Sequence, residues 1–143
     1  MTQVYNMTIT KMNDSLKNTL RLNALSCLGF GLTFALIPQP IAEFLDGIAP
    51  SIIRFVGIGL ALNGIHLVIA SLRRGGIGRV ELGYFILGDV LWVLASFVLI
   101  AFIPHVVNSP LAIVSTLAVA TLVGSFALLQ ARWGWDILQL NHS

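Results

Sequence analysis

Apolar residues fill four long stretches of the chain, and short polar or proline-containing segments separate them. The stretches cover residues 16–37, 51–72, 80–103 and 111–131. A helix of about 20 mainly apolar residues crosses the roughly 30 Å hydrocarbon core of a bilayer. Prolines stand at the ends of the stretches, and proline starts a helix well but cannot continue one. The pattern predicts an all-α, polytopic membrane protein built as a four-transmembrane-helix bundle.

The segments outside these spans are too short to form a second domain. We expect a flexible cytoplasmic tail over residues 1–15, one transmembrane domain over residues 16–135, and a cytoplasmic C-terminal tail over residues 136–143. The loop at 38–50 spaces Ile41, Phe44, Leu45 and Ile48 like one face of a short helix on the outer surface. A simple proline-bounded connector is the alternative for that loop.

The composition of the chain agrees with a membrane environment. Of 143 residues, 57% are hydrophobic and 10% are charged, whereas a soluble domain carries about 25% charged residues. The single cysteine, Cys27, cannot form an internal disulfide, and the chain has no CxxC or Cys/His metal signature. We therefore expect no metal and no cofactor.

The positive charges lie mainly on one side of the predicted membrane. With four spans, the N-terminus, the second loop and the C-terminus share a side, and only Arg54 of the eight Lys and Arg residues lies near the other. Because Lys and Arg concentrate in cytoplasmic segments, both termini should be cytoplasmic (N-in/C-in). This distribution explains the pI of about 9.1 without nucleic acid as a partner. The compact chain without a targeting signal suggests the bacterial inner (plasma) membrane. The seven residues on the cytoplasmic side are Lys11, Lys17, Arg21, Arg73, Arg74, Arg79 and Arg132.

A weak internal repeat relates the two halves of the chain. A shift of 66 residues places ALIP at 35–38 on AFIP at 101–104, and Asn23 on Asp89. Such an alignment suggests two parallel helical hairpins, although any two spans that end in proline would align in this way. Asn23 and Asp89 each lie 15 residues before their proline (38 − 23 and 104 − 89). Both are therefore about 22 Å from the outer end of their span, inside the hydrocarbon region.

Other polar residues are expected near Asp89. The second and third spans form a hairpin centred near residue 76, so Asn63 should match the depth of Asp89 and His66 should lie one turn closer to the cytoplasm. Trp92 and Ser96 share the helical face of Asp89. We predict a ligand- or proton-binding site, whose candidate residues are Asp89, Asn63, His66, Asn23, Trp92 and Ser96.

A lone carboxylate at this depth costs roughly 2.5–3.5 kcal/mol by insertion scales. Asp89 can avoid this cost if it is protonated, if it pairs with protonated His66, or if Asn and hydroxyl or indole groups donate hydrogen bonds to it. It can also line a wet cavity. The structural alternative is that these residues only hold the helices together, at about 0.6 kcal/mol per contact.

These observations favour a small membrane binding or accessory protein with a site for a proton, a lipid or a small apolar ligand. The alternative is a proton-coupled transporter or channel that works as an oligomer. A membrane enzyme using His66 and Asp89 is a third reading, but the chain has no Ser/His/Asp set, phosphate loop or paired carboxylates. Small-residue faces on the second and fourth spans predict a homo-oligomer or a subunit of a larger membrane complex. Membrane lipid is the other expected partner.

The charge distribution generates a prediction about topology. Reporter fusions at the C-terminus and within residues 38–50 should report opposite sides of the membrane, with the C-terminus in the cytoplasm. A C-terminus found outside the cytoplasm would contradict the orientation.

Overall fold

The computed structural model describes residues 11–139, which form helices and connecting turns without a β-strand. The helices are α1 (Asp14–Leu36), α2 (Pro38–Leu45), α3 (Pro50–Leu72), α4 (Arg79–Phe102), α5 (Pro110–Trp133) and α6 (Trp135–Leu138). Among these, α1, α3, α4 and α5 are long and apolar enough to cross a membrane. The predicted all-α fold with four membrane-spanning helices is confirmed.

Local sequence signals explain where the helices begin. Pro38, Pro50 and Pro110 each open a helix, where the missing N–H of proline has no intrahelical partner to lose. Asn13 caps α1, because its Oδ1 accepts a hydrogen bond of 2.7 Å from the backbone N–H of Leu16. The loop between the first two spans contains the short helix α2, which agrees with the predicted helix and not with a simple connector.

The folded part extends beyond the boundaries expected from the sequence. Met12 is buried in the core and α1 begins at Asp14, although both positions fall in the predicted N-terminal tail. Ile137 of α6 is also buried, within the predicted C-terminal tail. Residues 1–10 and 140–143 of those tails lie outside the described part of the chain.

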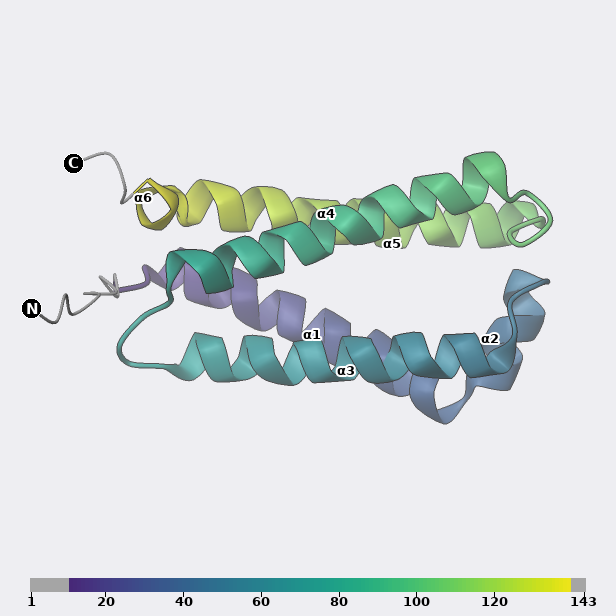
Figure 1. Ribbon diagram of the computed structural model, residues 1–143, viewed down its shortest axis with the longest axis horizontal. Helices are drawn as coiled ribbons and strands as arrows, with labels where there is room; N and C mark the ends of the chain where they lie inside the picture. Colours follow the sequence, from purple (N-terminus) through teal and green to yellow (C-terminus); the bar gives the residue numbers. More distant parts are fainter. Residues whose placement is uncertain (1–10, 140–143) are drawn as a thin grey trace, which may run out of the picture.

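The four long helices form two antiparallel pairs. Helix α1 packs along α3, helix α4 packs along α5, and the contact of α1 with α5 joins the pairs, whereas the backbones of α3 and α4 lie farther apart and meet through side chains beside their turn. Figure 1 shows α1 and α3 in one layer and α4 and α5 in the other. The start of α1 and helix α6 lie at the same end of the bundle (Figure 1).

Glycines allow α1 and α3 to approach closely. A Cβ atom added to Gly57 would lie 2.5 Å from the backbone nitrogen of Ala35, and one added to Gly31 would lie 2.5 Å from that of Ala61. The small-residue face of α3 is thus used within the chain, as small faces are in membrane helix pairs. On α5, a Cβ on Gly124 would lie 3.4 Å from Val93 Cγ2 of α4, an ordinary van der Waals contact, so this glycine does not bring the two backbones together in the same way. These faces do not themselves require a second copy, and the homo-oligomer stays a prediction.

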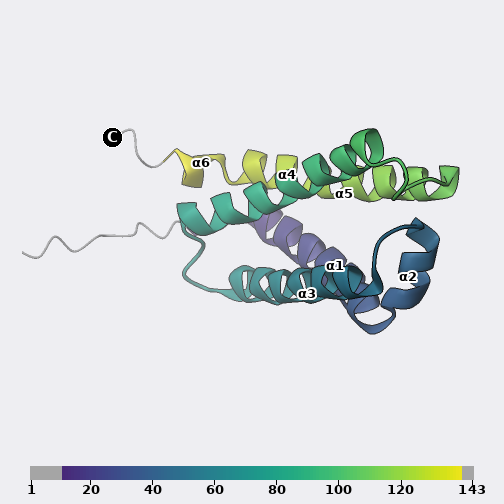
Figure 2. The ribbon, with the colours of Figure 1, turned by 45° about the vertical axis from the view of Figure 1, so that its right-hand side comes forward.

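The buried apolar core lies toward the end of the bundle that holds the start of α1. It combines the first half of α1, the end of α3, the start of α4 and α6. At the opposite end, the turn at Gly47 lies against the loop at His105, since a Cβ on Gly47 would be 2.9 Å from the carbonyl oxygen of His105. The ribbons of α3 and α4 separate from their turn toward the end of the bundle that holds α2 (Figure 2). The core side chains are Met12, Leu16, Leu20, Ala24, Cys27, Leu67, Ala70, Ile77, Leu82, Phe85 and Ile137.

Large apolar side chains remain exposed on all four long helices, as Leu25, Phe55, Leu91 and Leu128 illustrate. A soluble domain rarely exposes such extensive apolar surface. In a bilayer the same side chains would contact lipid tails, so the surface agrees with a membrane-spanning bundle.

The close packing of α1 on α3 generates a matched test. Gly57→Ala should lower the free energy of unfolding by about 1–3 kcal/mol, because the new methyl group meets backbone that cannot move aside. Gly59→Ala is the control, since its Cβ meets nothing within 4 Å, and it should be neutral or stabilising by up to about 1 kcal/mol. Unfolding in bicelles measures both, and equal effects would contradict the packing.

Candidate functional site

Asp89 lies between the two layers and is held by amide side chains from both. Its Oδ2 accepts a hydrogen bond of 2.8 Å from Asn23 Nδ2 on α1 and one of 2.6 Å from Gln130 Nε2 on α5. Asp89 is 5% exposed, Asn23 is 1% exposed and Gln130 is fully buried. The carboxyl group therefore joins three helices through neutral donors, with little water around it.

Sequence reasoning placed Asn23 beside Asp89 and missed Gln130. Counted from the turn, Asp89 lies 13 positions before the end of α4 (102 − 89), whereas Gln130 lies 20 positions after the start of α5 (130 − 110). The backbone positions of Asp89 and Gln130 therefore lie at different depths, so a comparison of depths alone does not predict their contact. The side chains can meet because Cα–Cβ bonds tilt toward the helix N-terminus, so side chains on antiparallel helices lean toward one another. The sequence signal for Gln130 was a long side chain with a polar amide group inside an apolar span.

A weaker chain of contacts extends from Asn23 to α3, the long helix that does not contact Asp89. Cys27 Sγ donates to Asn23 Oδ1 at 3.5 Å, and Asn63 Nδ2 of α3 donates to Cys27 Sγ at 3.7 Å. Sulfur is a weak partner in both roles. Asn63 thus reaches the cluster through Cys27 and does not contact Asp89 directly. Polar side chains from α1, α3, α4 and α5 meet in one cluster, defined by Asn23, Cys27, Asn63, Asp89 and Gln130.

His66 does not pair with Asp89, so one of the options that the sequence left open for Asp89 is not realised. Its Nε2 lies 2.8 Å from Glu81 Oε1, and Arg73 Nη1 donates to the other oxygen of Glu81 at 2.8 Å. Glu81 precedes Asp89 by eight residues (89 − 81), which is about 12 Å along a helix. His66 also contacts Phe85, with ring centroids 4.8 Å apart. It belongs to a second polar group beside the α3–α4 turn.

Ser96 and Trp92 also make no direct hydrogen bond to Asp89. Ser96 is buried, but its hydroxyl donates to the backbone oxygen of Trp92 at 2.9 Å, within its own helix. Trp92 lies one turn beyond Asp89 and lines a cavity beside it. The role of both residues in binding stays a prediction.

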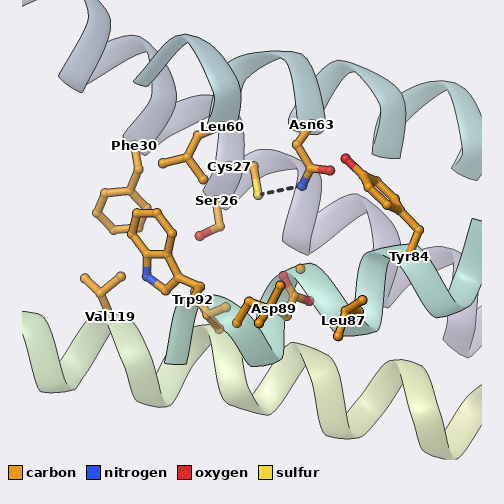
Figure 3. Close-up of a pocket in the computed structure, with 13 residues that line it drawn as sticks. Ser26, Cys27, Phe30, Leu60, Asn63, Tyr84, Leu87, Asp89, Trp92 and Val119 are labelled. Atoms are coloured by element: carbon orange, nitrogen blue, oxygen red, sulfur yellow. Dashed lines mark hydrogen bonds between the residues drawn. The ribbon is translucent and has the colours of Figure 1, made fainter. Parts of the chain in front are cut away.

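A cavity of about 240 Å³ lies between the layers, and all four long helices line it. Asp89 and Asn63 contribute its polar wall, whereas most of the remaining wall is apolar or aromatic. In Figure 3, Trp92 and Phe30 lie at one end of the cavity and Tyr84 lies at the other, with Asp89 between them. The other lining residues are Ser26, Cys27, Leu60, Leu87, Gly88, Leu91, Val119 and Val123.

The two oxygens of Asp89 differ in their surroundings. Oδ2 takes both amide donors, while no side chain in residues 11–139 donates to Oδ1. The described residues also contain no group of three or more His, Cys, Asp or Glu side chains placed to share a metal ion. Chemically, the arrangement offers a ligand one carboxyl oxygen at the edge of an apolar cavity.

No model of a protein family, no curated protein and no solved structure matches the chain. The class of protein is therefore defined by fold and site alone. It is a membrane protein of two helical hairpins, joined by a buried carboxyl–amide cluster beside an apolar cavity.

The contacts of Asp89 can be tested by a double-mutant cycle in bicelles. Asp89→Leu and Gln130→Met should show a coupling energy of about 0.6–1.7 kcal/mol, the range found for hydrogen bonds between membrane helices. Asp89→Leu and His66→Phe are the control pair, and their effects should add to within about 0.5 kcal/mol, because His66 binds Glu81. Coupling to His66 without coupling to Gln130 would contradict the geometry.

Proposed function

We propose that the chain is a small membrane protein that binds a mainly apolar molecule in the cavity beside Asp89. The observation that carries the proposal is the combination of apolar walls with one buried carboxyl group, whose Oδ1 has no donor among the described residues. Ligand sites commonly combine a mainly apolar lining with a few polar groups that fix orientation. A protein that used Asp89 only to hold its helices together would need no cavity there.

Access to this cavity favours a ligand that arrives from the bilayer. Tyr84, Leu87 and Leu91 line the cavity, yet they are 54%, 57% and 54% exposed. The wall formed by α4 is therefore partly open at the surface. In a membrane this opening faces lipid, so a lipid tail or another bilayer-soluble molecule can enter without crossing water.

A second candidate is a proton-coupled transporter or channel in which Asp89 carries the proton. It is favoured by the absence of an ion pair to Asp89 within the described residues. A transport path would also need polar groups that connect Asp89 to water on both sides of the membrane. The cavity opens toward lipid instead, so ligand binding is the first candidate.

We also propose a bacterial inner membrane location with both termini in the cytoplasm. The positive charges at the ends and in the second loop support this orientation. The start of α1 and helix α6 lie at one end of the bundle (Figure 1), as an even number of crossings requires. Assembly into a homo-oligomer or a larger complex belongs to the same proposal.

Filling the cavity tests the proposed binding. Gly88 lines the cavity and its added Cβ would meet nothing within 4 Å, so Gly88→Leu adds a side chain at the cavity wall, where its Cβ has room. We expect Gly88→Leu to weaken binding of a neutral apolar probe, tert-butylbenzene, by at least about tenfold, a loss of about 1.4 kcal/mol of binding free energy. Fluorescence of Trp92 in nanodiscs reports binding when Trp133 and Trp135 are replaced by Phe.

The matched control is Gly83→Leu, on the same helix. Its Cβ also meets nothing within 4 Å, but Gly83 does not line the cavity. Both substitutions remove a helix glycine and should raise helix stability equally. If tert-butylbenzene binds Gly88→Leu as tightly as it binds Gly83→Leu, the cavity is not the binding site.

A further inference from the structure

We infer that the molecule bound beside Asp89 is a lipophilic cation, such as an organic ammonium that carries an aromatic or alkyl group. This inference rests on the proposed binding function and specifies its ligand class. It follows from three features of the cavity: an unbalanced carboxylate, aromatic side chains, and a matching size.

The carboxyl group of Asp89 has no positive partner in the described part of the chain. The side chains that face it or its cluster are Asn23 and Cys27 from α1, Asn63 from α3 and Gln130 from α5, and none of them is a cation.

The basic groups of the described residues make no ion pair with Asp89. His66 and Arg73 both bind Glu81, and no ion pair joins Lys17, Arg21 or Arg132 to Asp89. Two amide donors orient the carboxylate without neutralising it. Because an isolated charge is costly at this depth, a bound cation would supply the partner that stabilises the ionised form of Asp89 over its protonated form.

Aromatic rings lie at both ends of the cavity that such a cation would occupy. Trp92 and Phe30 lie at one end of the cavity and Tyr84 lies at the other, on either side of Asp89 (Figure 3). The electron-rich faces of aromatic rings attract ammonium groups, and tryptophan does so most strongly. A carboxylate among aromatic rings favours a cation over a neutral molecule and disfavours an anion.

The size of the cavity limits the cation to a small one. An apolar cavity of roughly 150 Å³ holds benzene, and this cavity measures about 240 Å³. It therefore accommodates one aromatic ring with an alkylammonium group. Phenyltrimethylammonium meets this description, and tert-butylbenzene is its uncharged counterpart of the same shape.

The two probes provide the test in nanodiscs of zwitterionic lipid, which does not concentrate cations at its surface. Fluorescence of Trp92, in the protein with Trp133 and Trp135 replaced by Phe, reports the affinity of each probe. We expect phenyltrimethylammonium to bind at least about tenfold more tightly than tert-butylbenzene. Asp89→Asn should remove this difference and leave the affinity of tert-butylbenzene within about twofold.

Glu81→Gln is the matched control, since Glu81 is a carboxylate on the same helix that binds His66 and Arg73 and does not line the cavity. It should leave the preference for the cation unchanged. If Asp89→Asn fails to fold, the ratio of the two affinities in the protein with Asp89 still decides.

The outcomes separate this inference from the proposed function. Equal or tighter binding of tert-butylbenzene overturns the cationic ligand and leaves apolar binding intact. Binding of neither probe overturns both. Loss of the preference in Glu81→Gln as much as in Asp89→Asn also overturns the assignment to Asp89.

Discussion

A carboxyl group inside an apolar bundle must receive hydrogen bonds from other helices, and the arrangement of this protein depends on that requirement. Asn23 and Gln130 donate to the same oxygen of Asp89, one from each layer of the bundle. Removal of either donor would leave the group short of partners where water cannot replace them. These hydrogen bonds are directional, so they fix the axial position and rotation of α4 against α1 and α5. Contacts between apolar side chains are less directional and constrain both less.

This cluster borders both the core and the cavity between the layers. The core consists of apolar side chains from α1, α3, α4 and α6. The cavity runs past Asp89, from Trp92 and Phe30 at one end to Tyr84 at the other (Figure 3), and is partly open along α4. The close glycine-mediated contact of α1 with α3 keeps the first hairpin tight, so the open seam lies between the hairpins. Asp89 therefore serves structure through Oδ2 and leaves Oδ1 for a ligand.

The hydrophobic pattern predicted the four spans because length and composition alone decide whether a helix can cross a bilayer. Depth counted from Pro38 and Pro104 brought Asn23 to Asp89, since both α1 and α4 run in the same direction. The same counting failed for Gln130. It placed His66 one turn from Asp89, where His66 packs on Phe85, but it did not identify the partner of His66. For Gln130, side-chain direction on antiparallel helices offsets the backbone depth. His66 had two possible carboxylate partners on one face of α4, Glu81 and Asp89, and it binds Glu81. Sequence spacing alone does not decide between two such partners.

The central claim is that Asp89 joins the two layers through the amides of Asn23 and Gln130. Solid-state NMR in lipid bilayers tests it directly, through dipolar coupling between ¹³C in Asp carboxyl groups and ¹⁵N in Asn and Gln side-chain amides. Spectra of the protein and of Asp89→Asn, compared as a difference, isolate the contribution of Asp89. The account predicts strong short-range coupling that is lost in Asp89→Asn and about halved in Asn23→Leu or Gln130→Met. Coupling that is unchanged by all three substitutions would contradict it.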